Sequence, residues 1–177
     1  MMVRRAVVAA MVALAGMVLV VMPASASPAA SCGITWGSGT KTTQGMTSAP
    51  MVGLRAGQHD CYDRLVFDLR GAAAGYTVSY VDTVYDDPTA TPVPLRGGAK
   101  LQVTVFAPAY DETGTPTYQY ADRAELVNVN GFQTFRQVAW AGSFEGTTTV
   151  GLGVRARLPF RVFTADNRVV VDVAHSW

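Results

Sequence analysis

The sequence has few of the residues from which catalytic and metal sites are usually built. It contains two histidines and two cysteines among 177 residues, and it has no Gly-x-Ser-x-Gly motif. These residues show no zinc-type spacing, and no EF-hand pattern is present. We therefore expect no metal site and no cofactor, with a calcium site at Asp86 and Asp87 left open as an alternative.

An excess of charge of one sign is also missing. The chain has 14 basic and 13 acidic residues, and two of the basic ones, Arg4 and Arg5, lie in an N-terminal segment that resembles an export signal. Without that segment, 12 basic residues stand against 13 acidic ones. A domain so close to neutral has no global field that would attract nucleic acid or anionic membranes, so we expect no nucleic-acid partner.

Residues 1–26 have the layout of a secretory signal peptide. An uncharged run extends from Ala6 to Met22, and small residues follow up to Ala26, after which we expect cleavage. The run is shorter than the ~20 apolar residues of a membrane span, so we expect no stable span after cleavage. A linker at residues 27–31 then leads into one domain, residues 32–177, that is secreted or associated with the cell wall. The export route, Sec or twin-arginine, stays open.

The two cysteines, Cys32 and Cys61, are predicted to form a disulfide bond. An even cysteine count in an exported chain favours a bridge over a catalytic thiol. Closing a loop of about 30 residues stabilises a fold by roughly 3–4 kcal/mol in the chain-entropy model. A free thiol, an intermolecular bond and lipidation of Cys32 remain as alternatives.

Helical periodicity is absent, whereas apolar and polar residues alternate with period two in several stretches. Such alternation predicts an all-β, disulfide-stapled β-sandwich, with a partly open β-barrel as the alternative. The expected strands are 64–69, 76–81, 101–107, 123–129, 132–140 and 147–158, followed by a hairpin of 158–164 and 168–174. Residues 86–98 contain three prolines and are expected to form a loop.

Two of these stretches share one pattern. "RLVFDL" from Arg64 and "RVVVDV" from Arg168 both read Arg-x-Val-x-Asp-x. We interpret this as two strands with an Arg/Asp polar face, whose charged pairs could lie opposite each other across a sheet.

Two segments carry a resemblance to a known family. "AGQHDCYDRLVFDL" and "GVRARLPFRVF" resemble the AMIN-like family of secreted actinobacterial proteins, which is distantly similar to the AMIN domains of peptidoglycan amidases. The similarity extends over roughly residues 36–177. It implies a β-sandwich in the cell envelope that binds peptidoglycan, another wall polymer or an envelope protein, without catalysis. The oligomeric state is not indicated.

The candidate binding residues are cationic, polar and aromatic side chains. Guanidinium groups bind carboxylates and phosphates in bidentate fashion, and aromatic rings stack on sugars. The set is Arg155, Arg157, Arg161, His59, Tyr62, Asp63 and Tyr110. Alternatively, these arginines only pair with carboxylates such as Asp63, Asp68, Asp172 or Glu145.

Two other function classes remain open. The first is a small-ligand binder with a pocket between sheets, which a cavity of a few hundred Å³ would favour. The second, less favoured, is a wall-glycan hydrolase. It would use Glu145 with Asp60 or Asp63, or Ser38 with His59, although the sequence spacing does not show that these side chains converge.

Overall fold

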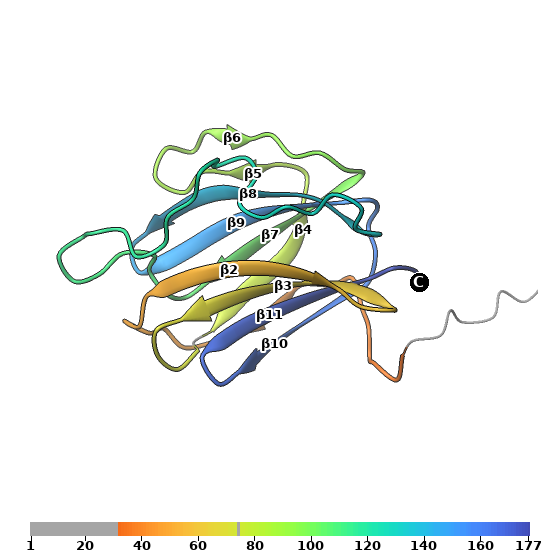
Figure 1. The fold of residues 1–177 in the computed structure, drawn as a ribbon, viewed down its shortest axis with the longest axis horizontal. Coiled ribbons are helices and arrows are strands. Elements are labelled where there is room, and N and C mark those ends of the chain that lie inside the picture. The colour runs from red at the N-terminus through yellow and green to blue at the C-terminus, as the bar shows by residue number, and fades with distance from the viewer. Residues whose placement is uncertain (1–31, 74) are drawn as a thin grey trace, which may run out of the picture.

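The computed structural model describes residues 32–73 and 75–177, and all regular structure in these ranges is β-strand. Two antiparallel sheets pack face to face, and a third, two-stranded sheet lies above the larger one (Figure 1). The larger sheet has the order β1 (Lys41–Thr43), β4 (Tyr76–Val81), β7 (Ala99–Val105), β9 (Thr147–Val154), β8 (Phe135–Phe144). The smaller sheet has the order β10 (Phe160–Ala165), β11 (Arg168–Ala174), β3 (Tyr62–Leu69), β2 (Met51–Gln58).

Alternating side chains explain why these strands build a sandwich. On β3, Leu65, Phe67 and Leu69 are buried in the core between the sheets, and the residues between them face outward. The facing sheet contributes valines and leucines of β4, β7 and β9 to the same core. Both sheets keep free edges, so the all-β sandwich prediction is confirmed and the barrel alternative is not.

The outer face of the larger sheet is covered by the chain itself. The segment with β5 (Val84–Tyr85) and β6 (Pro92–Val93) lies on this face (Figure 1). Gly151 and Gly153 of β9 let it approach closely, because a Cβ at Gly153 would lie 2.0 Å from the carbonyl oxygen of Arg96. The expected loop at 86–98 is therefore confirmed, apart from the two residues of β6.

Two of the expected strands differ from the structure. Residues 123–129 are not a strand, and β9 ends at Val154 instead of continuing to residue 158. Val154 pairs with the first residue of β7 and the first residue of β8, so β9 has no partner beyond it. Arg155 and Arg157 consequently lie outside the sheet. The predicted C-terminal hairpin is confirmed as β10 and β11.

The expected signal peptide and linker, residues 1–31, lie outside the described residues, and their assignment stays a prediction. Over the residues that are described, no helix is long and apolar enough to span a membrane.

Candidate functional site

The outer face of the smaller sheet carries most of the paired charges of the domain. Strands β3 and β11 run antiparallel, with Arg64 opposite Asp172 and Asp68 opposite Arg168. Because all four residues alternate with core residues, they all point outward. The reciprocal Arg/Asp pairing expected from the repeated pattern is thus confirmed.

Asp172 is shared by two arginines. Its carboxylate accepts hydrogen bonds from Nε and Nη2 of Arg64 at 2.7 and 2.9 Å, and from Nε of Arg161 at 2.8 Å. The carboxylate is fully buried, whereas the two arginine side chains are 26% and 30% exposed. The arginines therefore cover the aspartate and present their remaining N–H groups to solvent.

Asp68 is shared in the same way. It accepts hydrogen bonds from Nε and Nη2 of Arg55 at 2.8 and 3.1 Å, and from Nε of Arg168 at 3.1 Å. The bond from Arg55 is the main cause that lowers the pKa of Asp68; partial burial opposes it, and the bond from Arg168 adds to it. This carboxylate is therefore held in its charged form.

Aromatic rings surround the cluster that Asp172 forms with its two arginines. The guanidinium of Arg161 lies 5.7 Å from the ring centre of Trp36, 5.5 Å from that of Tyr62 and 5.1 Å from that of Phe163. The imidazole of His59 stacks on Tyr62, with ring centres 4.6 Å apart. Cation–π contacts of this kind attract the guanidinium to the ring faces and so help to hold it in place. We call this surface the arginine–aromatic face and define it as Arg55, Arg64, Arg161, Arg168, Asp68, Asp172, Trp36, His59, Tyr62 and Phe163.

The face is cationic, although the domain as a whole is not. Its four arginines are balanced by only two aspartates, which leaves a formal charge of +2 with His59 neutral. Both carboxylates are held by two arginines each, an arrangement that suits binding of an anion better than proton transfer.

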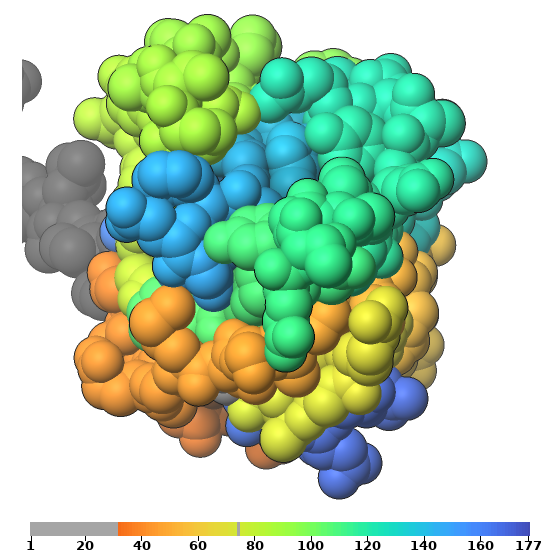
Figure 2. Space-filling view, turned by 90° about the vertical axis from the view of Figure 1, so that its left-hand side faces the viewer, coloured from red at the N-terminus to blue at the C-terminus, as the bar shows by residue number. Residues whose placement is uncertain are grey.

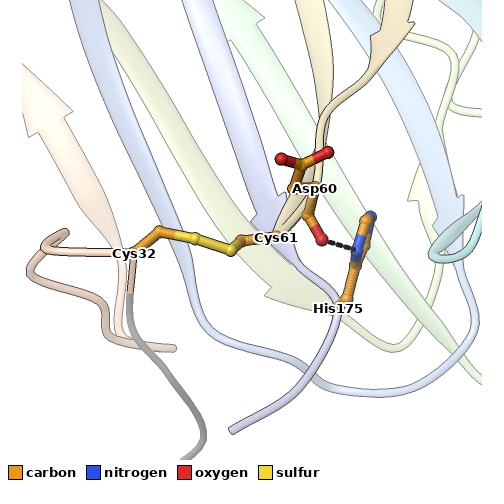
Figure 3. The surroundings of a disulfide bond; sticks show 4 residues. All are labelled: Cys32, Asp60, Cys61 and His175. Atoms are coloured by element: carbon orange, nitrogen blue, oxygen red, sulfur yellow. Dashed lines mark hydrogen bonds between the residues drawn. A yellow bond between two sulfur atoms is a disulfide. The ribbon is translucent and has the colours of Figure 1, made fainter.

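A disulfide bond between Cys32 and Cys61 ties the segment that carries Trp36 to the start of β3, as predicted (Figure 3). On the other side of Cys61, the carbonyl oxygen of Asp60 lies 3.3 Å from Nδ1 of His175, just after β11. The N-terminal segment, β3 and the C-terminal segment are therefore fixed together beside the face.

Of the seven candidate residues, the structure brings His59, Tyr62 and Arg161 together on this face. Asp63 follows Tyr62 on the strand and therefore points the opposite way, into the sandwich, where it is fully buried. Its carboxylate accepts hydrogen bonds from the backbone N–H groups of Thr134 and Phe135 at 2.6 and 2.9 Å, and its other oxygen lies 3.0 Å from Nε2 of His175. The alternation of the strand therefore places Asp63, a candidate binding residue, in the interior and away from the surface on which Tyr62 lies.

The other three candidates lie elsewhere. Arg155 donates to the carbonyl oxygens of Gln133 and His175, and the guanidinium of Arg157 stacks over Tyr80 at 4.8 Å. Tyr110 accepts a hydrogen bond from the N–H of Gly146 through its hydroxyl. The binding roles of these three residues stay predictions.

Seven residues of the face were not among the candidates: Arg55, Arg64, Arg168, Asp68, Asp172, Trp36 and Phe163. The repeated Arg-x-Val-x-Asp pattern already pointed to Arg64 and Arg168. The place of Trp36 depends on the disulfide and on the bridge between Gly37 and Phe160, which no local pattern indicates.

A separate pocket of about 510 Å³ lies on the other side of the molecule, between the β5–β6 segment, β8 and residues 123–124. Figure 2 shows the yellow-green and teal segments standing on either side of a recess with blue strand residues between them. Pro92, Val93, Pro94 and Ala139 give it an apolar lining. At its rim Arg123 donates to Asp86 at 2.7 Å. Burial would raise the pKa of Asp86, but the hydrogen bonds from Thr89 and Arg123 outweigh it and lower the pKa.

Comparison with known proteins places the chain in a family. The family model described as the AMIN-like domain matches residues 49–175, which include all four strands of the smaller sheet. Searches of curated proteins and of solved structures give no match. The match covers well over half of the chain, and the chain therefore belongs to the AMIN-like domain family.

Proposed function

We propose that the protein is a secreted, non-catalytic domain that binds a polymer of the cell wall, such as peptidoglycan, through the arginine–aromatic face. AMIN-like domains are in general non-catalytic binding domains related to the cell wall. The observation that carries the proposal is the set of partly exposed arginines and aromatic rings on the outer face of the smaller sheet. The N-terminal signal pattern and the disulfide support an extracellular location.

The side chains of the face suit a sugar polymer with polar substituents. Aromatic rings such as that of Tyr62 offer an apolar surface to the C–H groups of a sugar ring. Among the hydrogen bonds of the described residues, Arg161 uses only its Nε, so its two Nη groups remain for a ligand. Because Asp172 and the stacked rings already hold this guanidinium in place, binding orders few additional groups.

Co-sedimentation of the mature protein with isolated sacculi tests the proposal. The informative variant is Arg161→Gln/Arg55→Gln, which removes one arginine from each cluster and leaves Arg64 on Asp172 and Arg168 on Asp68. The control is Arg70→Gln/Arg96→Gln, which removes the same charge from two exposed arginines elsewhere. We expect wild type and control to sediment with the sacculi and the face variant to remain largely in solution.

Two further readouts separate this proposal from its alternatives. Equal sedimentation of the face variant and wild type would contradict binding by the arginine–aromatic face. Loss of binding in Arg155→Ala/Arg157→Ala instead would place the site beyond the end of β9. Release of soluble fragments from the sacculi would indicate a hydrolase.

The pocket beneath β5 and β6 favours a second candidate function, binding of a small ligand. Its volume of about 510 Å³ and its apolar lining are typical of small-molecule sites. Screening the mature protein with small molecules by NMR tests this function. Binding that perturbs Val93 and Ala139 would support it, and the absence of any binder would speak against it.

A further inference from the structure

The charges of the arginine–aromatic face are gathered in two clusters. Arg64, Asp172 and Arg161 form the first cluster, and Arg55, Asp68 and Arg168 form the second. Each cluster has two arginines and one aspartate and therefore a formal charge of +1. The same number of residues separates Arg64 from Asp68 on β3 and Arg168 from Asp172 on β11, so the clusters lie roughly 13 Å apart at the rise of an extended strand.

The row of residues between the two clusters is apolar on three of the four strands. Phe163, Val170 and Val66 are paired there across β10, β11 and β3, and Arg55 ends the row on β2, from where its side chain reaches Asp68. The two valines are almost fully buried, at 4% exposure each, whereas Phe163 is half-buried and contacts the guanidinium groups of the first cluster. A ligand lying along the strands therefore meets a cationic point, the ring of Phe163 and a second cationic point.

Both clusters keep N–H groups for an anion. Within the described residues, Arg161 and Arg168 each donate only through Nε, and Arg64 and Arg55 only through Nε and Nη2. The free edges of these guanidinium groups have the planar geometry that matches a carboxylate or a phosphate. The shared aspartates cancel only half of the positive charge.

From this arrangement we infer that the ligand is a polyanion, a polymer whose carboxylate or phosphate groups reach both clusters at once. The inference rests on the proposed function, since it names the kind of wall polymer that the face would bind. Two weak anion sites on one chain act together, because binding at the first raises the effective concentration of anions at the second. A neutral glycan strand would offer no anion to the positive charge that the aspartates leave unbalanced in each cluster.

Chemically altered sacculi test the inference and identify the anion. One sample has its carboxyl groups converted to amides, a second has its phosphodiester-linked polymers removed with acid, and a third has both treatments. We expect retention to fall by about tenfold or more in the doubly treated sample, because neither cluster then finds an anion and the avidity of two linked sites is lost. Loss after the first treatment alone identifies carboxylates, and loss after the second alone identifies phosphates.

The outcomes distinguish the inference from the proposed function. Unchanged retention on doubly treated sacculi would overturn the polyanion inference and leave wall binding in place. No retention on untreated sacculi would overturn the proposed function itself.

The spacing of the clusters can be tested without wall material. Calorimetric titration with pyrophosphate, and with polyphosphate long enough to span both clusters, compares one anionic contact with two. We expect the long chain to bind the wild type about tenfold more tightly or better, and we expect Arg161→Gln to lose most of that advantage. Equal affinities for the short and the long probe would overturn simultaneous binding at both clusters.

Discussion

Asp63 is a buried carboxylate that joins three segments of the chain. It holds the backbone of Thr134 and Phe135 at the start of β8 and the imidazole of His175 after β11. Removing a buried hydrogen-bond acceptor usually costs about 1–3 kcal/mol for each donor, because the donors lose their partner without regaining water.

Asp63→Ala should therefore lower the free energy of unfolding by about 3 kcal/mol or more. Asp60→Ala is the control, because Asp60 is exposed and an exposed side chain usually contributes within about 0.5 kcal/mol. Urea denaturation of both variants measures the difference. Similar midpoints for the two variants would contradict a framework role for Asp63.

The lowered pKa of Asp68 predicts that the stability of the fold depends on pH. Its folded-state pKa is lowered, chiefly by the hydrogen bond from Arg55, below the value of about 3.9 expected in an unfolded chain. The stabilisation is therefore complete above the unfolded pKa and is lost as the pH falls through the folded pKa. Asp68→Asn should be less stable than wild type at neutral pH and should lose less stability between about pH 5 and pH 2. Thermal unfolding across this range tests it; parallel curves for the two proteins would contradict the assignment.

Strand β9 requires glycine because another segment packs closely on it, and not because its backbone forms a turn. Its outward positions Gly151 and Gly153 lie beneath the segment that carries β5 and β6. Gly153→Ala would force a Cβ against the carbonyl of Arg96, so it should cost about 1–3 kcal/mol in the free energy of unfolding. Gly57→Ala on β2 meets no atom within 4 Å and should be close to neutral. Chemical denaturation compares them, and equal stability of the two variants would show that the covering segment can move aside.

Strands with alternating β-branched and polar residues could be predicted from the sequence, whereas β2 could not. Its sequence, "MVGLRAGQ", contains two glycines, which have low strand propensity. It is a strand because β3 supplies a partner along its whole length. Gly53 also leaves room beside Asp68, whose side chain lies 3.5 Å from where a Cβ would be.

Residues 123–129 show the opposite case, a strand pattern without a strand. Leu126 and Val127 pack against the core and Val129 is buried, which explains the apolar alternation. The segment forms only two backbone hydrogen bonds with β8, from Leu126 N–H to Val138 and from Trp140 N–H to Arg123. The apolar residues of this segment are therefore explained by burial against the core and not by pairing in a sheet.

The candidate site could be predicted only in part from the sequence. His59, Tyr62 and Arg161 were named from their residue types, and the Arg/Asp pairing from the repeated pattern. The placement of Trp36 beside the sheet depends on the disulfide and on the bridge between Gly37 and Phe160. Both join residues that are far apart in the sequence, so a local pattern does not indicate them.

At the scale of the whole molecule, the two sheets differ in what covers them. The outer face of the larger sheet lies under the β5–β6 segment, whereas the outer face of the smaller sheet bears the paired arginines and the aromatic rings. Because the domain is close to neutral overall, its cationic surface is local, and binding should depend on this face more than on net charge. The disulfide and the His175–Asp63 contact hold the segment after Cys32 and the segment after β11 beside it.

The location of the ligand tests this account most directly. Isotope-labelled mature protein, titrated with soluble fragments of cell-wall polymer, would report it through NMR shift changes of the backbone and side-chain N–H groups. We predict the largest changes at Nε of Arg64 and Arg161 and at the indole N–H of Trp36. Changes confined to the pocket around Val93 and Ala139, or to Arg155 and Arg157, would contradict binding by the arginine–aromatic face.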